Sequence, residues 1–255
     1  MKDIFLKTTI LQIILCLSFN ILFANSNNDL FEKANKAYSK GDYTLSKKLY
    51  HNILIDGECS SELYFNLANT YFKLDSIPQA ILYYEKAKIL SPSDEDIEHN
   101  LKIANAKTID KIEVIPQLFF VSWFQSILNF FSTNTWAWLS VISSILCFSL
   151  YGFYLRSISN SIKKISFYIG SILCITCIGL IFITNAAHNS NKSMRAVVFA
   201  ASVTLKSEPN ANATSLFVVH EGATCKILEQ LDNWFRVKLD NGNEGWLPSS
   251  DLQKI

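Results

Sequence analysis

TWAWLSVISSILCFSLYGFY, residues 135–154, and ISFYIGSILCITCIGLIFIT, residues 165–184, decide how this chain is organised. No charged residue occurs from Val114 to Leu155, and none occurs from Ile165 to Asn191. An α-helix rises about 1.5 Å per residue, so roughly 20 apolar residues cross the hydrocarbon core of a bilayer. We therefore predict two transmembrane helices, over residues 135–155 and 165–186. The alternative, two buried core helices, is disfavoured because neither stretch has an amphipathic face.

The loop between the two predicted spans sets their orientation. Residues 156–164 contain Arg156, Lys163 and Lys164 and no acidic residue. Short loops rich in lysine and arginine stay in the cytoplasm. We therefore expect a cytoplasmic loop, with both long flanking segments on the other side of the membrane.

The N-terminus independently indicates export. Lys2 and Lys7 precede an apolar run over residues 10–23, and Ala24 follows it. A basic part, an apolar part and a small residue in this order are typical of a secretory signal peptide. We predict a signal peptide over residues 1–24. The sequence leaves open whether it is cleaved, and an uncleaved one would still export the segment that follows.

Composition argues against several classes of protein. The 255 residues include 23 Lys and Arg against 22 Asp and Glu, whereas nucleic-acid-binding domains are normally more basic. An apolar fraction of 49% argues against a disordered chain. The four histidines lie in separate segments, without a recognisable catalytic or metal-binding motif. We expect no nucleic-acid partner, no enzymatic activity, no metal and no cofactor.

The cysteines do not point to catalysis. Cys174 and Cys177 form a C-x-x-C pair inside an apolar stretch, where packing is a more frequent role than redox chemistry. Cys59 and Cys225 lie in the two exported segments, where an oxidising compartment would allow a disulfide. The sequence does not decide whether they pair.

The first exported segment carries an internal repeat with a period of 34 residues. Ala34 aligns with Ala68, and Tyr50 aligns with Tyr84. The second copy has small and aromatic residues at regular places, namely Tyr64, Leu67, Ala68, Tyr71, Ala80, Tyr84, Ala87 and Pro92. This pattern resembles the tetratricopeptide repeat, which implies pairs of antiparallel helices stacked as a solenoid. We assign residues 25–109 to two repeats plus a third helix after Ser93.

The resemblance to tetratricopeptide repeats also implies a peptide-binding groove lined by the first helix of each pair. The residues that would face it are Phe31, Asn35, Tyr38, Glu62, Phe65, Asn66, Asn69, Phe72 and Lys73. Asn35 and Asn66 match two positions of the carboxylate clamp found in some members, but the basic clamp positions are not matched. An apolar ligand contact is therefore expected. The alternative is that the aromatic residues only pack helix against helix.

Residues 110–134 form the expected linker to the first span. Gln117–Phe131 is rich in phenylalanine and contains Trp123, which is compatible with a position on the membrane surface. It lacks the basic face that usually accompanies such a position.

The tail, residues 187–255, has short β runs separated by turns, with Asp240-Asn241-Gly242 as a hairpin signal. It resembles the bacterial SH3 family in Glu221-Gly222, in Trp234-x-x-Val237 and in Gly245-Trp246-Leu247. The resemblance implies a small β-barrel that binds cell-wall peptides or other proteins. Trp234 and Trp246 belong either to a ligand groove or to the core, and the core is favoured for Trp246.

The order of the parts resembles the BatE-type proteins of the Bacteroidetes aerotolerance operon. Residues 92–97, 100–101 and 107–112 carry the likeness in sequence. It implies a multidomain membrane protein: an α-helical tetratricopeptide repeat solenoid, two transmembrane helices and a C-terminal all-β SH3-like barrel. It also implies a bacterial inner membrane with both terminal domains periplasmic, and partners that include membrane proteins with von Willebrand factor A domains.

The expected function is a non-enzymatic scaffold linked to aerotolerance and oxidative stress. A tether or envelope sensor that binds murein peptides is the alternative.

Overall fold

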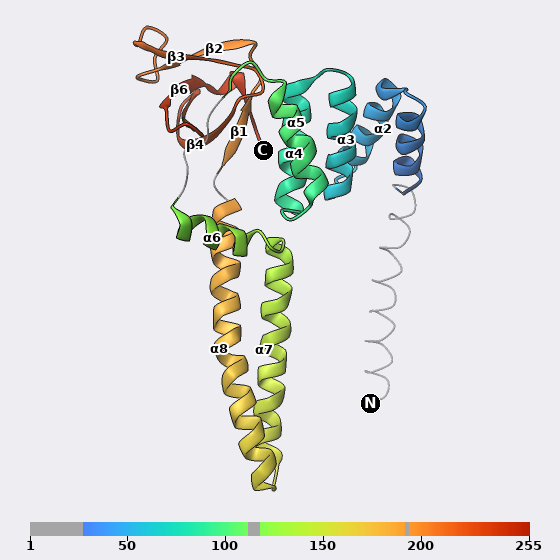
Figure 1. The fold of residues 1–255 in the computed structure, drawn as a ribbon, viewed down its shortest axis with the longest axis vertical. Helices are drawn as coiled ribbons and strands as arrows, with labels where there is room; N and C mark the ends of the chain where they lie inside the picture. Colours follow the sequence, from blue (N-terminus) through green and yellow to red (C-terminus); the bar gives the residue numbers. More distant parts are fainter. Residues whose placement is uncertain (1–27, 112–117, 192–193) are drawn as a thin grey trace, which may run out of the picture.

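The computed structural model describes residues 28–111, 118–191 and 194–255 (Figure 1). The predicted signal peptide lies outside these residues. Two long helices form a hairpin, here called the stem. At one end of it lies the head, which consists of residues 28–111 and 194–255, with a row of helices beside a β-sheet (Figure 1).

The helical part of the head is a series of short helices joined by tight turns. A helix over residues 28–39 is followed by four more, α2 (Tyr43–Ile55), α3 (Ser61–Lys73), α4 (Ile77–Leu90) and α5 (Glu95–Ala106). Asp42, Ser60 and Asp94 cap α2, α3 and α5, because each side chain accepts a hydrogen bond from a main-chain N–H of the first turn.

Small residues allow these helices to approach closely. Ala34, Ala68 and Ala80 are fully buried, and large side chains such as Tyr50 and Tyr84 fill the space around them. Ser46 stands where the second copy has Ala80, and it is equally buried. Its hydroxyl donates to the carbonyl oxygen of Ala34 at 3.1 Å, so the polar group is satisfied inside the core.

The stem consists of α7 (Thr133–Arg156) and α8 (Asn160–Asn191), which pack along their length. Both are long and apolar enough to cross a membrane, as far as length and composition decide it. α7 extends slightly beyond the predicted span, and α8 exceeds its span at both ends. Lys163 and Lys164 therefore lie in the first two turns of α8, and only residues 157–159 separate the two helices.

A shorter apolar helix, α6 (Phe119–Leu128), lies across the end of the stem that faces the head (Figure 1). Leu128 is buried against Trp136 of α7 and Ala187 of α8. The indole N–H of Trp136 donates to the carbonyl oxygen of Leu128 at 3.2 Å. This contact ties the C-terminus of α6 to the end of the hairpin.

The β part of the head is a single antiparallel sheet. Its strands are β1 (Arg195–Val198), β2 (Ser202–Lys206), β3 (Ser215–His220), β4 (Thr224–Leu231), β5 (Trp234–Leu239), β6 (Glu244–Pro248) and β7 (Leu252–Lys254), with a 3₁₀ turn η1 (Ser249–Asp251) before β7. Alternate residues such as Leu205, Val237 and Leu247 form the core on one face.

The predicted barrel is not closed. The strand order is β3-β2-β6-β5-β4-β1-β7, so β3 and β7 are the two ends of an open sheet. The side chain of Asp110, which follows α5, accepts a hydrogen bond from the main-chain N–H of His220 at the end of β3. In a closed barrel a neighbouring strand would accept from this N–H.

The helical part and the sheet meet in one hydrophobic cluster, and the sheet also has a core of its own. Val197 of β1 is fully buried in the cluster that contains Ile81 and Leu101 of the helical part, and Phe199 and Ile255 pack against the same cluster. The head is therefore continuous across the two sequence segments that flank the stem.

Candidate interaction surfaces

Asn35 joins three helices through its side-chain oxygen. The hydroxyl of Tyr50 in α2 donates to Asn35 Oδ1 at 2.5 Å, and the amide of Asn66 in α3 donates to the same oxygen at 3.3 Å. Burial raises the pKa of Tyr50 to about 12, so the phenol remains a neutral donor at physiological pH.

The same contacts recur 34 residues later. Tyr84 of α4 donates to Asn69 Oδ1 at 2.5 Å, and Asn100 of α5 donates to it at 2.9 Å. The ring contacts recur too: Phe31 lies 5.8 Å from Tyr50 and Phe65 lies 5.9 Å from Tyr84, between ring centroids. The internal repeat read from the sequence is thus present as repeated side-chain geometry.

The structure divides the predicted groove residues into two groups. Glu62 and Lys73 are exposed, whereas the other members are half-buried, namely Phe31, Asn35, Tyr38, Phe65, Asn66, Asn69 and Phe72. Asn35, Asn66 and Asn69 are engaged in the contacts between helices, so packing accounts for part of their role. Phe72 lies under the amine of Lys107, 4.5 Å from its ring centroid.

One cavity brings two of the predicted residues together. Phe31 and Glu62 line a space of about 420 Å³ at the N-terminal end of the helical row, with Ile53 and the exposed Cys59 beside them. Asn69, Phe72 and Lys73 lie further along α3 and do not line it.

A cluster of aromatic side chains between α2, α3 and α4 combines Tyr71 of the repeat pattern with His51 and Tyr83, which the pattern does not include. His51 Nε2 lies 2.6 Å from the hydroxyl of Tyr71, and Tyr71 stacks on Tyr83 with centroids 5.5 Å apart. Desolvation by burial, followed by the nearby Lys47 cation, lowers the pKa of His51. These residues come from three helices with no common spacing, so only the tertiary fold reveals them.

The outward face of β5 and β6 carries both predicted tryptophans. Trp234 and Trp246 are half-buried, while Phe235 and Leu247, their neighbours in sequence, are in the core. Trp246, for which the core is the favoured of the two predicted positions, is half-buried on the face of β6 opposite to that of Leu247. A Cβ at Gly245 would meet Leu205 Cβ at 2.9 Å, so the glycine must take the inward position and Trp246 points away from the core.

Charged residues surround Trp246 on this face. Arg236 lies directly opposite it in the ladder, and Glu244 Oε2 accepts from Arg236 at 2.9 Å while its Oε1 accepts from Lys238 at 3.0 Å. The hydrogen bond from Lys238 is the main cause that lowers the pKa of Glu244. The surface thus combines two aromatic rings with a paired set of charges.

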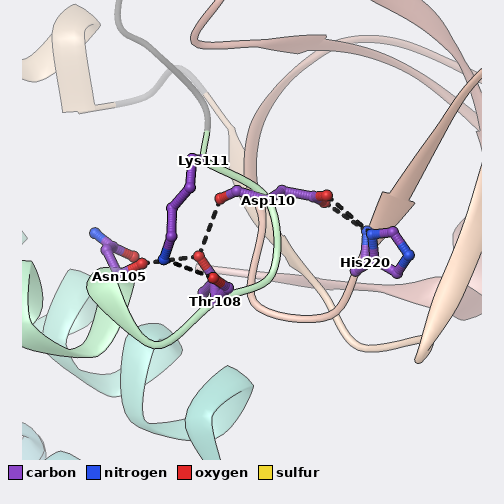
Figure 2. Close-up of polar contacts among 5 residues, drawn as sticks. All are labelled: Asn105, Thr108, Asp110, Lys111 and His220. Carbon is purple, nitrogen blue, oxygen red and sulfur yellow. Dashed lines mark hydrogen bonds and ion pairs between the residues drawn. The ribbon is translucent and has the colours of Figure 1, made fainter.

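The junction between the helical part and the sheet is held by polar contacts (Figure 2). Asp110 Oδ2 accepts from the main-chain N–H of His220 at 2.6 Å, and Asp110 Oδ1 lies 2.9 Å from His220 Nδ1. The amine of Lys111 donates to the carbonyl oxygens of Ala106 and Thr108, at 2.6 and 2.8 Å. Lys111 thus satisfies main-chain acceptors at the C-terminal end of α5.

Two further contacts cross this junction. Arg195 of β1 lies 3.8 Å from the buried carboxylate of Glu85 in α4, and 3.6 Å from Asp240. Gly222, in the turn after β3, has φ +83°, and a Cβ there would stand 2.7 Å from Cγ2 of Thr108. The junction was not foreseen from the sequence, because its partners are more than a hundred residues apart.

The described cysteines carry free thiols, Cys59 and Cys225 included. Cys225 is buried in the sheet core and its Sγ lies 3.6 Å from the carbonyl oxygen of Ala196. Burial raises the pKa of this thiol to about 12. Within residues 28–111, 118–191 and 194–255, no three His, Cys, Asp or Glu side chains are placed to hold a metal ion together.

A comparison with curated proteins gave no match. A comparison with protein-family models gave one for the tail of the chain. Residues 201–253, which include β2 to β6 and both outward tryptophans, match the bacterial SH3 domain.

Proposed function

We propose that the chain is a non-enzymatic scaffold, anchored in a bacterial inner membrane, that assembles a protein complex on the periplasmic side. The observation that carries the proposal is the continuous head. Its helical part and its SH3-like sheet meet in one hydrophobic cluster, yet each keeps an outward surface of its own. A head of this kind holds two binding surfaces at a fixed separation beside the membrane.

We further propose that residues 25–109 form a tetratricopeptide repeat domain. The recurrence of the Tyr50–Asn35–Asn66 contacts as Tyr84–Asn69–Asn100 supports this, because each set joins one helix pair to the next. The order of the modules, like that of BatE-type proteins, supports a link to aerotolerance and partners with von Willebrand factor A domains.

The test is a pull-down of the tagged full-length protein from native membranes in mild detergent, read by mass spectrometry. We expect enrichment of membrane proteins with von Willebrand factor A domains. Recovery of the chain as a lone monomer would contradict the scaffold.

A charge reversal at the exposed groove position Lys73→Glu, compared with Lys48→Glu on α2, tests the groove. Both lysines are exposed. Lys73→Glu should reduce the amount of co-purified partner at least about fivefold, which corresponds to about 1 kcal/mol of binding free energy. Lys48→Glu should leave that amount unchanged.

A second candidate function is a tether or envelope sensor that binds murein peptides. The match to a bacterial SH3 domain, together with the outward Trp234 and Trp246, favours it. Sedimentation of the purified full chain with murein sacculi tests it. Pelleting that Trp246→Ala reduces, without a change in the melting temperature, would support the tether, and absence of pelleting would exclude it.

A further inference from the structure

The end strand of the sheet, β3, has main-chain groups that face away from its neighbour β2. His220 pairs with Ser202, but its N–H donates to Asp110 instead, so this pair does not exchange ladder hydrogen bonds. In an antiparallel ladder such pairs alternate with hydrogen-bonded ones. The N–H and C=O of Val218, two residues before His220, therefore also point to the open edge.

A gap lies alongside this edge. Val218 and Val219 line a cavity of about 210 Å³, and Asn241 and Asn243 of the β5–β6 turn line the same cavity. Asp110 and Lys111 lie at the same cavity. Exposed apolar side chains continue along the strand, with Leu216, Phe217 and Val218 exposed by 41%, 38% and 53%.

We propose that this edge binds an extended segment of a partner polypeptide, which adds to the sheet as a further strand beside β3. The inference rests on the scaffold function and specifies how the SH3-like part would hold a partner. An extended backbone is the group that pairs with both the N–H and the C=O of Val218 at strand spacing. The side-chain amides of Asn241 and Asn243 line the same cavity and can hydrogen-bond to this backbone, although Asn241 Oδ1 already accepts from the main-chain N–H of Asn243 and so Asn241 offers its donors.

The chemistry of the gap favours a segment without strong charge. Asp110 is bonded to His220, and the amine of Lys111 is bonded to two carbonyl oxygens, so both charges next to the gap are already engaged. The edge also continues an existing contact. Asp110 already accepts from the N–H of His220, which is the next outward-facing N–H along β3 after that of Val218. A cavity of about 210 Å³ has room for part of a single extended segment, whereas the edge strand of a folded second copy brings its own neighbouring strand with it.

The experiment uses the full chain in lipid nanodiscs and a phage-displayed library of 12-residue peptides. A peptide enriched on the wild-type chain is synthesised and measured against two variants. Val218→Pro removes the outward N–H and leaves the ladder to β2 intact, because proline is tolerated where the N–H is not used by a ladder. Val218→Ala is the matched control, since it keeps the N–H and shortens the side chain.

We expect binding to Val218→Pro to be at least about tenfold weaker than binding to Val218→Ala, the effect of a lost main-chain hydrogen bond. We also expect the Val218 amide to exchange with solvent more slowly once the peptide is bound. Equal melting temperatures of the two variants establish that both fold.

Four results would overturn the proposal: no enriched peptide, equal binding by the two variants, unchanged exchange at Val218, or a dimer that protects this amide without peptide. The last would assign the edge to a second copy. If the wild-type pull-down still yields partners, the edge proposal alone fails and the scaffold remains.

Discussion

At the scale of the residue, Asn69 contributes more than its half-buried position suggests. Its oxygen accepts from both Tyr84 and Asn100, which belong to the next two helices, α4 and α5. Asn69→Ala leaves the Tyr84 hydroxyl without this acceptor, so we expect a loss of about 1–3 kcal/mol in the free energy of unfolding. Denaturant unfolding of the full chain in detergent measures it. Asn52→Ala, at an exposed site on α2, is the control, and equal stability of the two variants would contradict the prediction.

His51 gives the helical part a dependence on pH. Its pKa is lowered in the folded head, first by desolvation and then by Lys47, so the unfolded chain binds the proton more readily. This contribution to stability is fully present above about pH 6.5, the ordinary histidine value, and is lost as the pH falls towards the folded pKa. We expect the melting temperature of the wild type to fall more between pH 7.5 and pH 5.5 than that of His51→Gln. If the melting temperatures of the wild type and His51→Gln fall equally over this pH range, His51 does not contribute to the pH dependence.

At the scale of the element, the neighbouring strands β5 and β6 separate folding from binding, because each has one face in the core and one face outward. Phe235 is in the core, and Phe235→Ala should cost about 3–5 kcal/mol in the free energy of unfolding. Trp246 lies on the outward face, so Trp246→Ala should cost less than half as much. The comparison is made by chemical unfolding that follows the sheet. If Trp246→Ala is as destabilising as Phe235→Ala, the ring is a structural residue and not a free surface.

The turn after β3 depends on a glycine for two separate reasons. Gly222 has φ +83°, which costs about 1 kcal/mol for another residue, and its missing Cβ leaves room for Thr108. Gly57 has φ +85° and nothing within 4 Å of the Cβ position, so Gly57→Ala carries the strain alone. We expect Gly57→Ala to lose about 1 kcal/mol of stability and Gly222→Ala at least about 2 kcal/mol. Thermal unfolding of both variants compares them, and equal losses would mean that Thr108 moves aside freely.

Local patterns predicted the elements well and their partners poorly. The charge-free stretches and the strand alternation identify helices and strands, because period and length are local properties. The face on which Trp246 lies is decided by its neighbour Gly245, which must point inward, and not by the apolar character of the tryptophan itself. The closed barrel was wrong, since the Asp110 side chain takes a place at the end of β3 that sequence spacing does not reveal.

The candidate surfaces also divide into contacts that local sequence predicts and contacts that it does not. The Asn35 and Asn69 contacts follow from a period that is visible in the sequence. The contact between Asp110 and His220 does not, because the two residues are 110 positions apart and on opposite sides of the stem in the chain. Nothing in either local sequence marks the other as a partner.

At the scale of the whole molecule, the hydrophobic cluster between the helical part and the sheet predicts that these two parts unfold together. Ile81 of α4 and Val197 of β1 are both fully buried in one cluster, and the Arg195–Glu85 pair spans the same boundary. Exposing either side leaves the apolar surface of the other in water, which costs about 25 cal/mol per Å². We therefore expect native-state hydrogen exchange to give one opening free energy for the amides of α4 and β1.

A double-mutant cycle on Asp110→Ala and His220→Ala then measures how firmly the junction is held. Residues in direct contact show coupling energies of about 0.5–3 kcal/mol, and we expect a value in this range for unfolding of the head. The exposed pair Lys33 and Asp29, within one helix, is the matched control and should couple by less than about 0.5 kcal/mol. Separate opening free energies for α4 and β1, or no coupling at the junction, would mean that the two surfaces move independently. A scaffold that holds its partners at one separation requires a single opening free energy and measurable coupling at the junction. Only a head that opens as one unit keeps the predicted groove and the edge of β3 at a fixed distance from each other.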